Sequence, residues 1–436
     1  MRLKRHAMVR REAFGGLVLC DDLWHTVLFV KPEVVDAIES GEIPLSMQEY
    51  LAMHNVVEAE KPVAPKPEWR EYELQELKVP QSCTHLAAPI SVALEITNRC
   101  NLSCIHCANR AGRESREELT TGEVMKLFDE WLQLRVFMVT ITGGEPFSRK
   151  DMVDLLQYAD ERGLHVFVLT NGLLITPRML ERIPRSVGFQ LSIDGLGDQY
   201  EYIRGPGTFR RLLQTIELLR ADRRPMGATL VFTKRNSRHA KEVLQFCLEK
   251  GIRLKVDPLL PLGRALDRWD DLAPDVADAQ LFLEVRRAKI EHFRRAYKDL
   301  FPSGRPFNVM DLPEILGALF LACEGGRSDL WVRYDGRAYP CANLSAADEF
   351  MLGSVRESSC ETIWNESATL QQFRKITWQT FKKCSSCEIA DYCTYRCPAF
   401  SLFYHGDFRT CGANDFTREV IKMARDEGIT DRVDGQ

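Results

Sequence analysis

The chain has 436 residues, of which 45% are hydrophobic, and a formal net charge of −4. That length is enough for two or three domains with separate cores. The small net charge excludes the strongly basic surface that binds nucleic acid or anionic membranes. No apolar stretch of signal-peptide length follows the basic N-terminus, and the longest apolar run, 315–323, is far shorter than the roughly 20 residues that span a bilayer. We therefore expect a cytoplasmic protein with no nucleic-acid or membrane partner.

Residues 1–78 predict a small winged-helix-like α+β domain followed by a linker. Apolar stretches around the Gly15-Gly16 and Asp21-Asp22 pairs, which we expect to be turns, predict short strands. Pro32 then begins a helical pattern. The strands are expected at 9–20 and 25–30, and the helices at 32–41, 45–57 and 68–77.

Residues 79–265 alternate short apolar runs with helical patterns. Strands are predicted at 92–97, 136–142, 165–170, 188–193, 227–233 and 253–258, and helices near 120–134, 150–162, 176–183, 208–221 and 237–250. Uniformly apolar strands separated by helices indicate a parallel sheet covered on both faces. Six repeats are fewer than a closed eight-unit barrel needs, so we predict an α/β fold with an open, partial (β/α)6 TIM-like barrel.

The unusual motifs of this region follow the predicted strands. They lie at 100–107, 143–146, 170–172, 192–195 and 258–264. In such folds the functional site lies at the C-terminal ends of the strands, so we expect these motifs to share one rim. Beyond the barrel, the sequence predicts a helical bridge at 266–319, a cysteine-rich domain at 320–415, and a C-terminal helix and tail at 416–436.

Fourteen cysteines are distributed along the chain, and ten of them fall into tight spacings. Disulfide frameworks are typical of short secreted proteins, whereas this chain is long and shows no export signal. The spacings therefore favour ligands of a metal ion or cluster.

Cys100, Cys104 and Cys107 offer three thiolates from one loop, which suit an iron–sulfur cluster or zinc. Structural zinc normally takes four protein ligands, and no fourth is nearby in the sequence. Three thiolates on a four-iron cluster would leave one iron open to a small molecule. A zinc site or unligated thiols remain the alternatives for this motif taken alone.

The stretches EITNRCNLSCIHC, TGGEP, LTNG and LSIDG resemble the radical S-adenosylmethionine (SAM) superfamily over roughly residues 90–265. The resemblance implies that Cys100, Cys104 and Cys107 hold a 4Fe–4S cluster whose open iron binds the amino and carboxylate groups of SAM. One electron from the cluster would cleave SAM, and the 5′-deoxyadenosyl radical would abstract hydrogen from the substrate. The cofactors carry this chemistry and the protein orients them.

The GGEP motif supplies candidate SAM contacts. Gly143 and Gly144 would permit close backbone approach to the amino group of the methionine part. Glu145 would accept hydrogen bonds from that ammonium, and Pro146 would fix the turn. An ordinary turn before a helix is the alternative.

Other family motifs supply further candidates. Ser192, Asp194 and Asn171 could bind the ribose or carboxylate, although such residues also favour turns for local hydrogen bonding. Arg204 could pair with the methionine carboxylate, or be a solvated arginine. His106 stands before the third cysteine, where the family often has an aromatic residue, and could cover the adenine.

The cysteine-rich region resembles the SPASM extension of radical SAM enzymes over about residues 320–415. The resemblance implies two auxiliary 4Fe–4S clusters, with zinc ribbons as the alternative. The cluster nearer the active site would be held by Cys323, Cys341 and Cys397, and the outer one by Cys384, Cys387, Cys393 and Cys411. Auxiliary clusters suit oxidative chemistry because they can carry away the second electron of a two-electron oxidation.

Some relatives carry a further cysteine just upstream of this motif, but residues 301–322 contain none. The inner cluster could therefore keep an open iron or recruit another ligand. Cys83, Cys247 and Cys360 are candidates, with an ordinary thiol as the favoured interpretation of each.

Residues 1–75 resemble the peptide-recognition domain related to the chaperone of pyrroloquinoline quinone biosynthesis. Such domains bind the leader of a precursor peptide by adding it as a strand to a sheet edge. A generic winged-helix cap or dimerisation module is the alternative.

Together these patterns predict a radical SAM/SPASM peptide maturase similar to the mycofactocin and pyrroloquinoline quinone maturases. It would oxidatively modify the core of a ribosomally made precursor peptide, by crosslinking or decarboxylation, with an electron donor such as flavodoxin or ferredoxin. A sulfatase-type maturase or a small-molecule radical oxidase is the first alternative. A non-catalytic iron–sulfur scaffold for peptide binding or electron transfer is the second.

Overall fold

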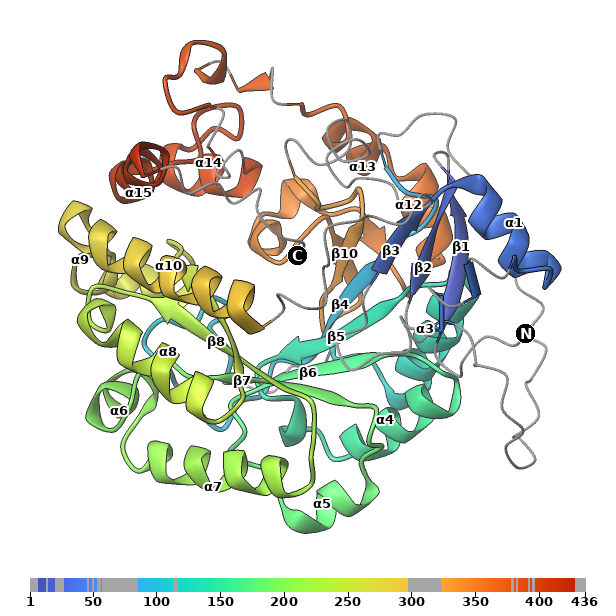
Figure 1. Cartoon of the computed structure of the whole chain (residues 1–436), viewed down its shortest axis with the longest axis horizontal. Coiled ribbons are helices and arrows are strands. Elements are labelled where there is room, and N and C mark those ends of the chain that lie inside the picture. The colour runs from blue at the N-terminus through green and yellow to red at the C-terminus, as the bar shows by residue number, and fades with distance from the viewer. Residues whose placement is uncertain are drawn as a thin grey trace.

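A nine-stranded sheet forms the centre of the molecule, with strand order β12-β11-β10-β4-β5-β6-β7-β8-β9 (Figure 1). The structure is a computed structural model that describes residues 7–12, 15–19, 27–44, 47–48, 51–52, 56, 85–112, 117–296, 323–377, 380–381, 383–390, 393 and 397–427. The strands of the large sheet are β4 (Ser91–Thr97), β5 (Met138–Gly143), β6 (Val166–Thr170), β7 (Gly188–Ser192), β8 (Met226–Phe232), β9 (Arg253–Pro258), β10 (Asp329–Val332), β11 (Arg337–Tyr339) and β12 (Gly353–Ser354).

Helices connect the strands in the expected order. Those of the barrel are α3 (Thr121–Gln133), α4 (Met152–Glu161), α5 (Pro177–Arg182), α6 (Asp198–Arg204), α7 (Thr208–Ala221) and α8 (Ala240–Glu249). Those that follow are α9 (Trp269–Leu272), α10 (Ala279–Ala296), α12 (Cys360–Glu366), α13 (Ala368–Phe373), α14 (Pro398–His405) and α15 (Asp415–Asp426). No helix in the described ranges is long and apolar enough to cross a membrane.

Strands β4 to β9 are parallel to their neighbours, as an open partial barrel requires. The six strands predicted in 79–265 are all present, each within two residues of the predicted bounds. The sheet does not end there, because β10 of the cysteine-rich region pairs parallel with β4. The barrel and the cysteine-rich region therefore share one sheet, which the sequence did not predict.

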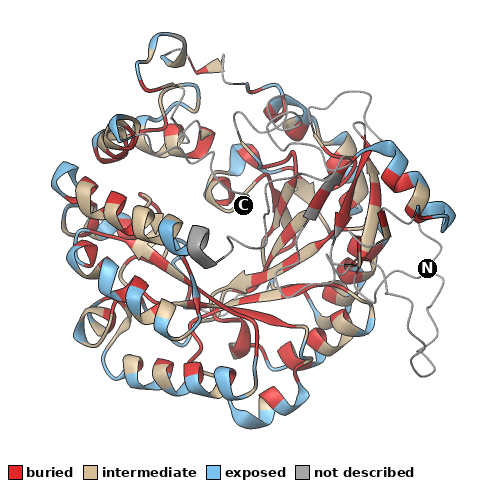
Figure 2. Cartoon of the chain, viewed as in Figure 1, coloured by how far each residue is buried: buried red, intermediate tan, exposed pale blue. Residues whose placement is uncertain are grey.

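Side chains alternate across the sheet. On β4, Val92, Leu94 and Ile96 are fully buried and join the main apolar core formed with the covering helices. On the opposite face, which lines the barrel interior, residues such as Thr140 and Thr142 of β5 are only half-buried. The buried strands and the exposed outer sides of the helices are visible in Figure 2.

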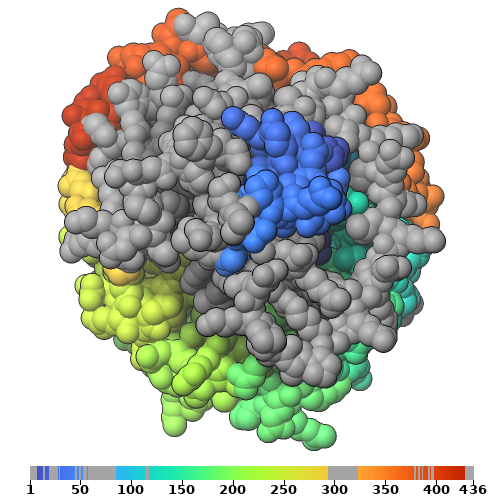
Figure 3. Space-filling view, turned by 45° about the vertical axis from the view of Figure 1, so that its right-hand side comes forward, coloured from blue at the N-terminus to red at the C-terminus, as the bar shows by residue number. Residues whose placement is uncertain are grey.

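The N-terminal unit is a separate antiparallel sheet of order β1-β2-β3, with α1 packed against it. Its elements are β1 (Met8–Glu12), β2 (Gly15–Leu19), β3 (Val27–Val30) and α1 (Pro32–Ser40), and Figure 3 shows the unit in blue at the surface. Gly15 and Gly16, expected in a turn, lie in β2 instead. A Cβ on Gly16 would lie 2.4 Å from Cγ2 of Val35, so the glycine lets α1 approach the sheet.

Parts of this unit lie outside the described residues. Of the helix predicted at 45–57, residues 47–48 and 51–52 are helical and residue 56 is a bend; the helix predicted at 68–77 is not described at all. The winged-helix-like topology therefore stays a prediction.

A buried arginine joins the N-terminal unit to the barrel. The guanidinium of Arg10 donates hydrogen bonds to the carbonyl oxygens of Ala88 (2.9 Å) and Pro89 (2.9 Å), just before β4, and of Arg135 (3.1 Å), just before β5. It also pairs with Glu12 at 2.8 Å. The unit is thus fixed at the N-terminal edge of the barrel sheet.

Candidate functional site

The loop after β4 carries the first cysteine motif at the C-terminal edge of the sheet. Cys104 is buried, whereas Cys100 and Cys107 are partly exposed. Burial raises the pKa of the Cys100 thiol to about 11 in the protein alone. Cluster ligation must therefore displace a proton from the Cys100 thiol.

Three predicted SAM contacts meet one another behind this loop. Asp194, which follows β7 and is fully buried, accepts hydrogen bonds from Arg204 Nε (2.6 Å), His106 Nε2 (3.0 Å) and the backbone N–H of Val231 (2.9 Å). The charges of Arg204 and His106 lower the pKa of Asp194 despite the opposing effect of burial. The Asp194 carboxylate is therefore ionised, and both of its oxygens accept hydrogen bonds from protein groups.

Arg204 also reaches the cysteine loop. Its Nη1 lies 3.8 Å from Sγ of Cys104, within hydrogen-bonding distance for sulfur, and its guanidinium lies over the ring of Tyr200. The nearby negative charge of Asp194 raises the pKa of Arg204, so the cation is permanent. In this arrangement Arg204 pairs with Asp194 and Cys104, and its pairing with the SAM carboxylate stays a prediction.

Glu145 of the GGEP motif is fully buried, and burial raises its pKa. Its carboxylate accepts hydrogen bonds from Thr170 Oγ1 (2.7 Å) and from the backbone N–H groups of Asn171 (2.8 Å) and Phe147 (3.1 Å). Glu145 thus ties the end of β5 to the end of β6. These contacts are all within the protein, so the role of Glu145 as an acceptor for the SAM ammonium stays a prediction.

The two glycines of the motif pack against the start of the cysteine loop. A Cβ on Gly143 would lie 2.3 Å from the carbonyl oxygen of Thr97, and one on Gly144 would lie 2.1 Å from that of Arg99. Pro146 begins a short 3₁₀ helix directly after this contact. The glycines are needed for the loop to lie against β5, whether or not SAM also approaches them.

Two other predicted contacts lie on the same rim. Asn171 is buried, and its side chain donates to Asn101 Oδ1 (2.9 Å) on the cysteine loop. Ser192 ends β7 and is half-buried on the interior face. The structure therefore brings all the motif residues to one edge of the sheet, as predicted.

Arg264 was missed by sequence reasoning as a contact of this loop. Its Nε donates to the carbonyl oxygen of Cys104 (2.8 Å) and its Nη1 to that of Ala111 (2.9 Å). The preceding residue, Gly263, has φ of +55°, and a Cβ there would lie 2.2 Å from the carbonyl oxygen of Cys107. The position of 258–264 after a strand was the only sequence signal for this clamp.

The cysteine-rich region gathers its thiols into two groups. Cys323, Cys341 and Cys397 pack against one apolar cluster, and burial raises the pKa of Cys323 well above its usual value. Cys387, Cys393 and Cys411 pack around a second apolar cluster, while Cys384 packs against the apolar cluster of the first group. Packing against these clusters does not show which thiols share an iron–sulfur cluster, so the inner and outer sets stay a prediction.

The two described candidates for a further inner ligand, Cys247 and Cys360, do not join these groups. Cys247 and Cys360 are fully buried in the barrel core, and Cys360 Sγ accepts a hydrogen bond from Trp131 Nε1 (3.2 Å). Both are ordinary core thiols, and burial raises the pKa of each to about 12. Cys83 lies outside the described residues.

The donor set fits iron–sulfur clusters. Each set of cysteines offers soft sulfur donors, and the buried guanidinium of Arg204 donates to Sγ of Cys104. Residues 94–247 match the radical SAM superfamily, and residues 323–388 match the iron–sulfur cluster-binding domain SPASM. The mycofactocin maturase MftC of Mycolicibacterium smegmatis is 30% identical over 73% of this chain and 80% of its own length. This chain belongs to the radical SAM superfamily. It is an enzyme whose cofactors are iron–sulfur clusters and SAM.

Other relatives of this radical SAM enzyme differ in their named activities. The AdoMet-dependent heme synthase of Methanosarcina barkeri is 30% identical over 74% of this chain and 94% of its own length. The PqqA peptide cyclase of Bradyrhizobium diazoefficiens is 29% identical over 79% of this chain and 92% of its own length. Family membership argues against a non-catalytic scaffold, but it does not by itself choose a substrate.

The fold of the whole chain resembles that of Streptococcus suis SuiB bound to its precursor peptide SuiA. The TM-score is 0.67 at 17% identity, covering 95% of this chain and 99% of SuiB. At that identity the match concerns the fold alone, and it confirms the predicted combination of a partial barrel with further domains.

Proposed function

We propose that this enzyme oxidatively modifies the core of a ribosomally made precursor peptide, whose leader binds the N-terminal unit. MftC and the PqqA cyclase are named as a maturase and a peptide cyclase, and SuiB has been crystallised with a precursor peptide. When bound, the cluster and SAM supply the 5′-deoxyadenosyl radical that abstracts hydrogen from the substrate. The reaction would take place in the cytoplasm, with a flavodoxin or ferredoxin as electron donor.

The observation that carries this proposal is the N-terminal sheet. Its strand β3 (Val27–Val30) pairs with β2 on one side, and within the described residues its other edge has no partner. A strand edge of this kind can accept a peptide as an additional strand. The Arg10 anchor holds the sheet against the barrel, so a bound leader would raise the local concentration of the core peptide at the active site.

Within this proposal, Cys100, Cys104 and Cys107 would hold the SAM-binding cluster. The inner auxiliary cluster would use Cys323, Cys341 and Cys397, and the outer one Cys384, Cys387, Cys393 and Cys411. Gly143, Gly144, Glu145, Pro146, Asn171, Ser192, Asp194, Arg204 and His106 form or support the pocket for SAM.

The similarity to a heme synthase favours a second candidate, oxidation of a small molecule. In that case the N-terminal unit would be structural. The two candidates differ in whether SAM cleavage depends on a peptide.

The test is anaerobic incubation of the reduced enzyme and SAM with peptides encoded by small open reading frames beside its gene. Mass spectrometry should show loss of two hydrogens from a peptide, accompanied by loss of carbon dioxide if the reaction is an oxidative decarboxylation, and the change should require the leader. A reconstituted enzyme that leaves every such peptide unchanged, yet forms 5′-deoxyadenosine with a small tetrapyrrole, would refute the peptide function and support the second candidate.

A further inference from the structure

Among the described residues, three carboxylates are buried near the C-terminal ends of the barrel strands, and one of them differs from the others. Glu145 after β5 and Asp194 after β7 each accept three hydrogen bonds that occupy both oxygens. Glu95 of β4 accepts two, from Trp331 Nε1 (3.1 Å) and Asn109 Nδ2 (3.2 Å), and both reach Oε1. No hydrogen bond from the described residues reaches its Oε2.

Glu95 lies on the interior face of the barrel. Its neighbours on β4, Leu94 and Ile96, point into the core under the helices, so Glu95 points to the opposite face. Only 4% of its surface is exposed. Its Oε2 has no hydrogen-bond partner among the described residues, yet it is not fully enclosed, so this oxygen stays open to a proton donor, whereas both oxygens of Glu145 and Asp194 are occupied.

Glu95 accepts hydrogen bonds from both cysteine-bearing regions of the chain. Asn109 lies two residues beyond Cys107 on the first cysteine loop, whereas Trp331 lies on β10 and packs against the apolar cluster around Cys323 and Cys341. Oε2 of Glu95 therefore faces the barrel interior between the loop of the SAM-binding cluster and the inner auxiliary group.

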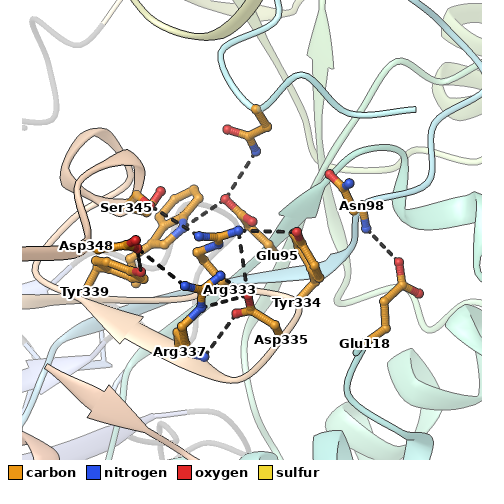
Figure 4. Close-up of polar contacts among 12 residues, drawn as sticks. Glu95, Asn98, Glu118, Arg333, Tyr334, Asp335, Arg337, Tyr339, Ser345 and Asp348 are labelled. Atoms are coloured by element: carbon orange, nitrogen blue, oxygen red, sulfur yellow. Dashed lines mark hydrogen bonds and ion pairs between the residues drawn. The ribbon is translucent and has the colours of Figure 1, made fainter. Parts of the chain in front are cut away.

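The charged groups around Glu95 leave its carboxyl able to titrate. Burial raises the pKa of Glu95 to about 7, Asp335 raises it slightly, and the charge of Arg333 opposes both. Arg333 does not bond to Glu95, because its guanidinium donates to Tyr334 Oη (3.2 Å) and lies 3.6 Å from Asp335. Figure 4 shows Glu95 beside Arg333, with Asp335 and Arg337 forming the adjoining ion pairs.

We propose that Glu95 accepts the proton that leaves the substrate when the substrate radical is oxidised. This inference rests on the proposed function. The substrate first loses a hydrogen atom to the deoxyadenosyl radical. The radical atom then bonds to a second atom of the peptide, whose bond to hydrogen breaks; the proton goes to Oε2 of Glu95, and an oxidised auxiliary iron–sulfur cluster held by the cysteines would take the remaining electron. The sum is the loss of two hydrogens from the peptide, and the carboxylate becomes a carboxylic acid.

A base matched to neutral pH contributes about 10²- to 10⁴-fold to a proton transfer. In the Glu95→Gln variant the amide oxygen still accepts from Trp331 and Asn109, but the side chain takes up no proton. We expect unchanged iron and sulfide content, continued formation of 5′-deoxyadenosine, and modified peptide reduced by about 10²-fold. In the wild type, product formation should fall as the pH drops below about 7, and this pH dependence should be absent in the variant.

Glu118 provides a matched control. It also holds the end of β4, accepting hydrogen bonds from Thr97 Oγ1 (2.8 Å) and the backbone N–H of Asn98 (2.9 Å). Glu118 lies apart from Glu95 in Figure 4. It lines an open pocket of about 500 Å³ to which Glu95 does not contribute. The Glu118→Gln variant should keep the wild-type ratio of 5′-deoxyadenosine to product and the wild-type pH step.

The proposal is overturned if Glu95→Gln forms product at the wild-type rate with the same pH step. Parallel loss of 5′-deoxyadenosine and product in both variants would also overturn it, since that indicates a structural role. Infrared difference spectra of the reconstituted wild type and Glu95→Gln provide a readout without peptide. Burial also raises the pKa of Asp329 to about 7, so the wild type should show a carboxylic acid band near neutral pH in addition to the one that both proteins share, and Glu95→Gln should lack this additional band. If no peptide is modified by the wild type, the proposed function fails, and this titration still tests Glu95, with absence of the additional band counting against it.

Discussion

Replacing Arg10 by methionine should release the N-terminal unit from the barrel. The side chains of Arg10 and Glu12 are 0% and 1% exposed, so the substitution leaves a buried carboxylate that holds only the backbone N–H of Ala87, at 2.8 Å. Removing one partner of a buried ion pair costs about 3–5 kcal/mol. Three hydrogen bonds to carbonyl oxygens of the barrel segment are lost as well. The equilibrium for local opening should therefore rise by about 10²- to 10⁴-fold.

Hydrogen exchange followed by mass spectrometry measures this opening. Amides of β1 and β2 should lose protection by that factor, whereas those of β6 and β7 in the barrel core should be unchanged. The double variant Arg10→Met/Glu12→Gln keeps an acceptor for Ala87 without a buried charge, and should recover part of the protection. Unchanged protection in the single variant, or equal losses in both variants, would refute the reasoning that a buried, unpaired charge controls the docking.

Three further changes test the site. Gly144→Ala places a Cβ 2.1 Å from the carbonyl oxygen of Arg99, so it should abolish 5′-deoxyadenosine formation while the circular dichroism spectrum stays native; retained SAM cleavage would contradict the close packing. Arg204→Gln removes the hydrogen bond to Cys104 Sγ and should lower the reduction potential of that cluster before SAM is added, measured by electron paramagnetic resonance in a redox titration. An unchanged potential with weakened SAM binding would instead support pairing with the SAM carboxylate. Cys360→Ala should leave the iron content unchanged because this thiol lies in the barrel core, whereas loss of iron would make it a ligand.

The barrel could be predicted from the sequence because its strands are long, apolar and separated by amphipathic helices. The added strands β10, β11 and β12 have only two to four residues each and lie among cysteines and turns, so their pattern is too short to indicate pairing with β4. The helix α6 was missed for a similar reason, since it has seven residues and follows a glycine-containing turn.

The site was predictable where its chemistry lies in contiguous motifs, as in the cysteine spacings. It was not predictable where distant residues meet. His106 and Asp194 are 88 positions apart, and Glu95 and Trp331 are 236 apart. The sequence suggested that Asp194 and Arg204 face a ligand, but no local pattern indicates that they bond to each other.

Because β10 pairs in parallel with β4, the two cysteine-bearing regions are joined in one hydrogen-bonded sheet. Hydrogen bonds between these two strands would fix the distance between iron–sulfur clusters bound on either side, which suits electron transfer over a constant gap. Because of this pairing, the cysteine-rich part cannot be removed without affecting the barrel. A chain cut before Cys323 would expose the long, apolar edge of β4, and we expect such a fragment to aggregate through that edge.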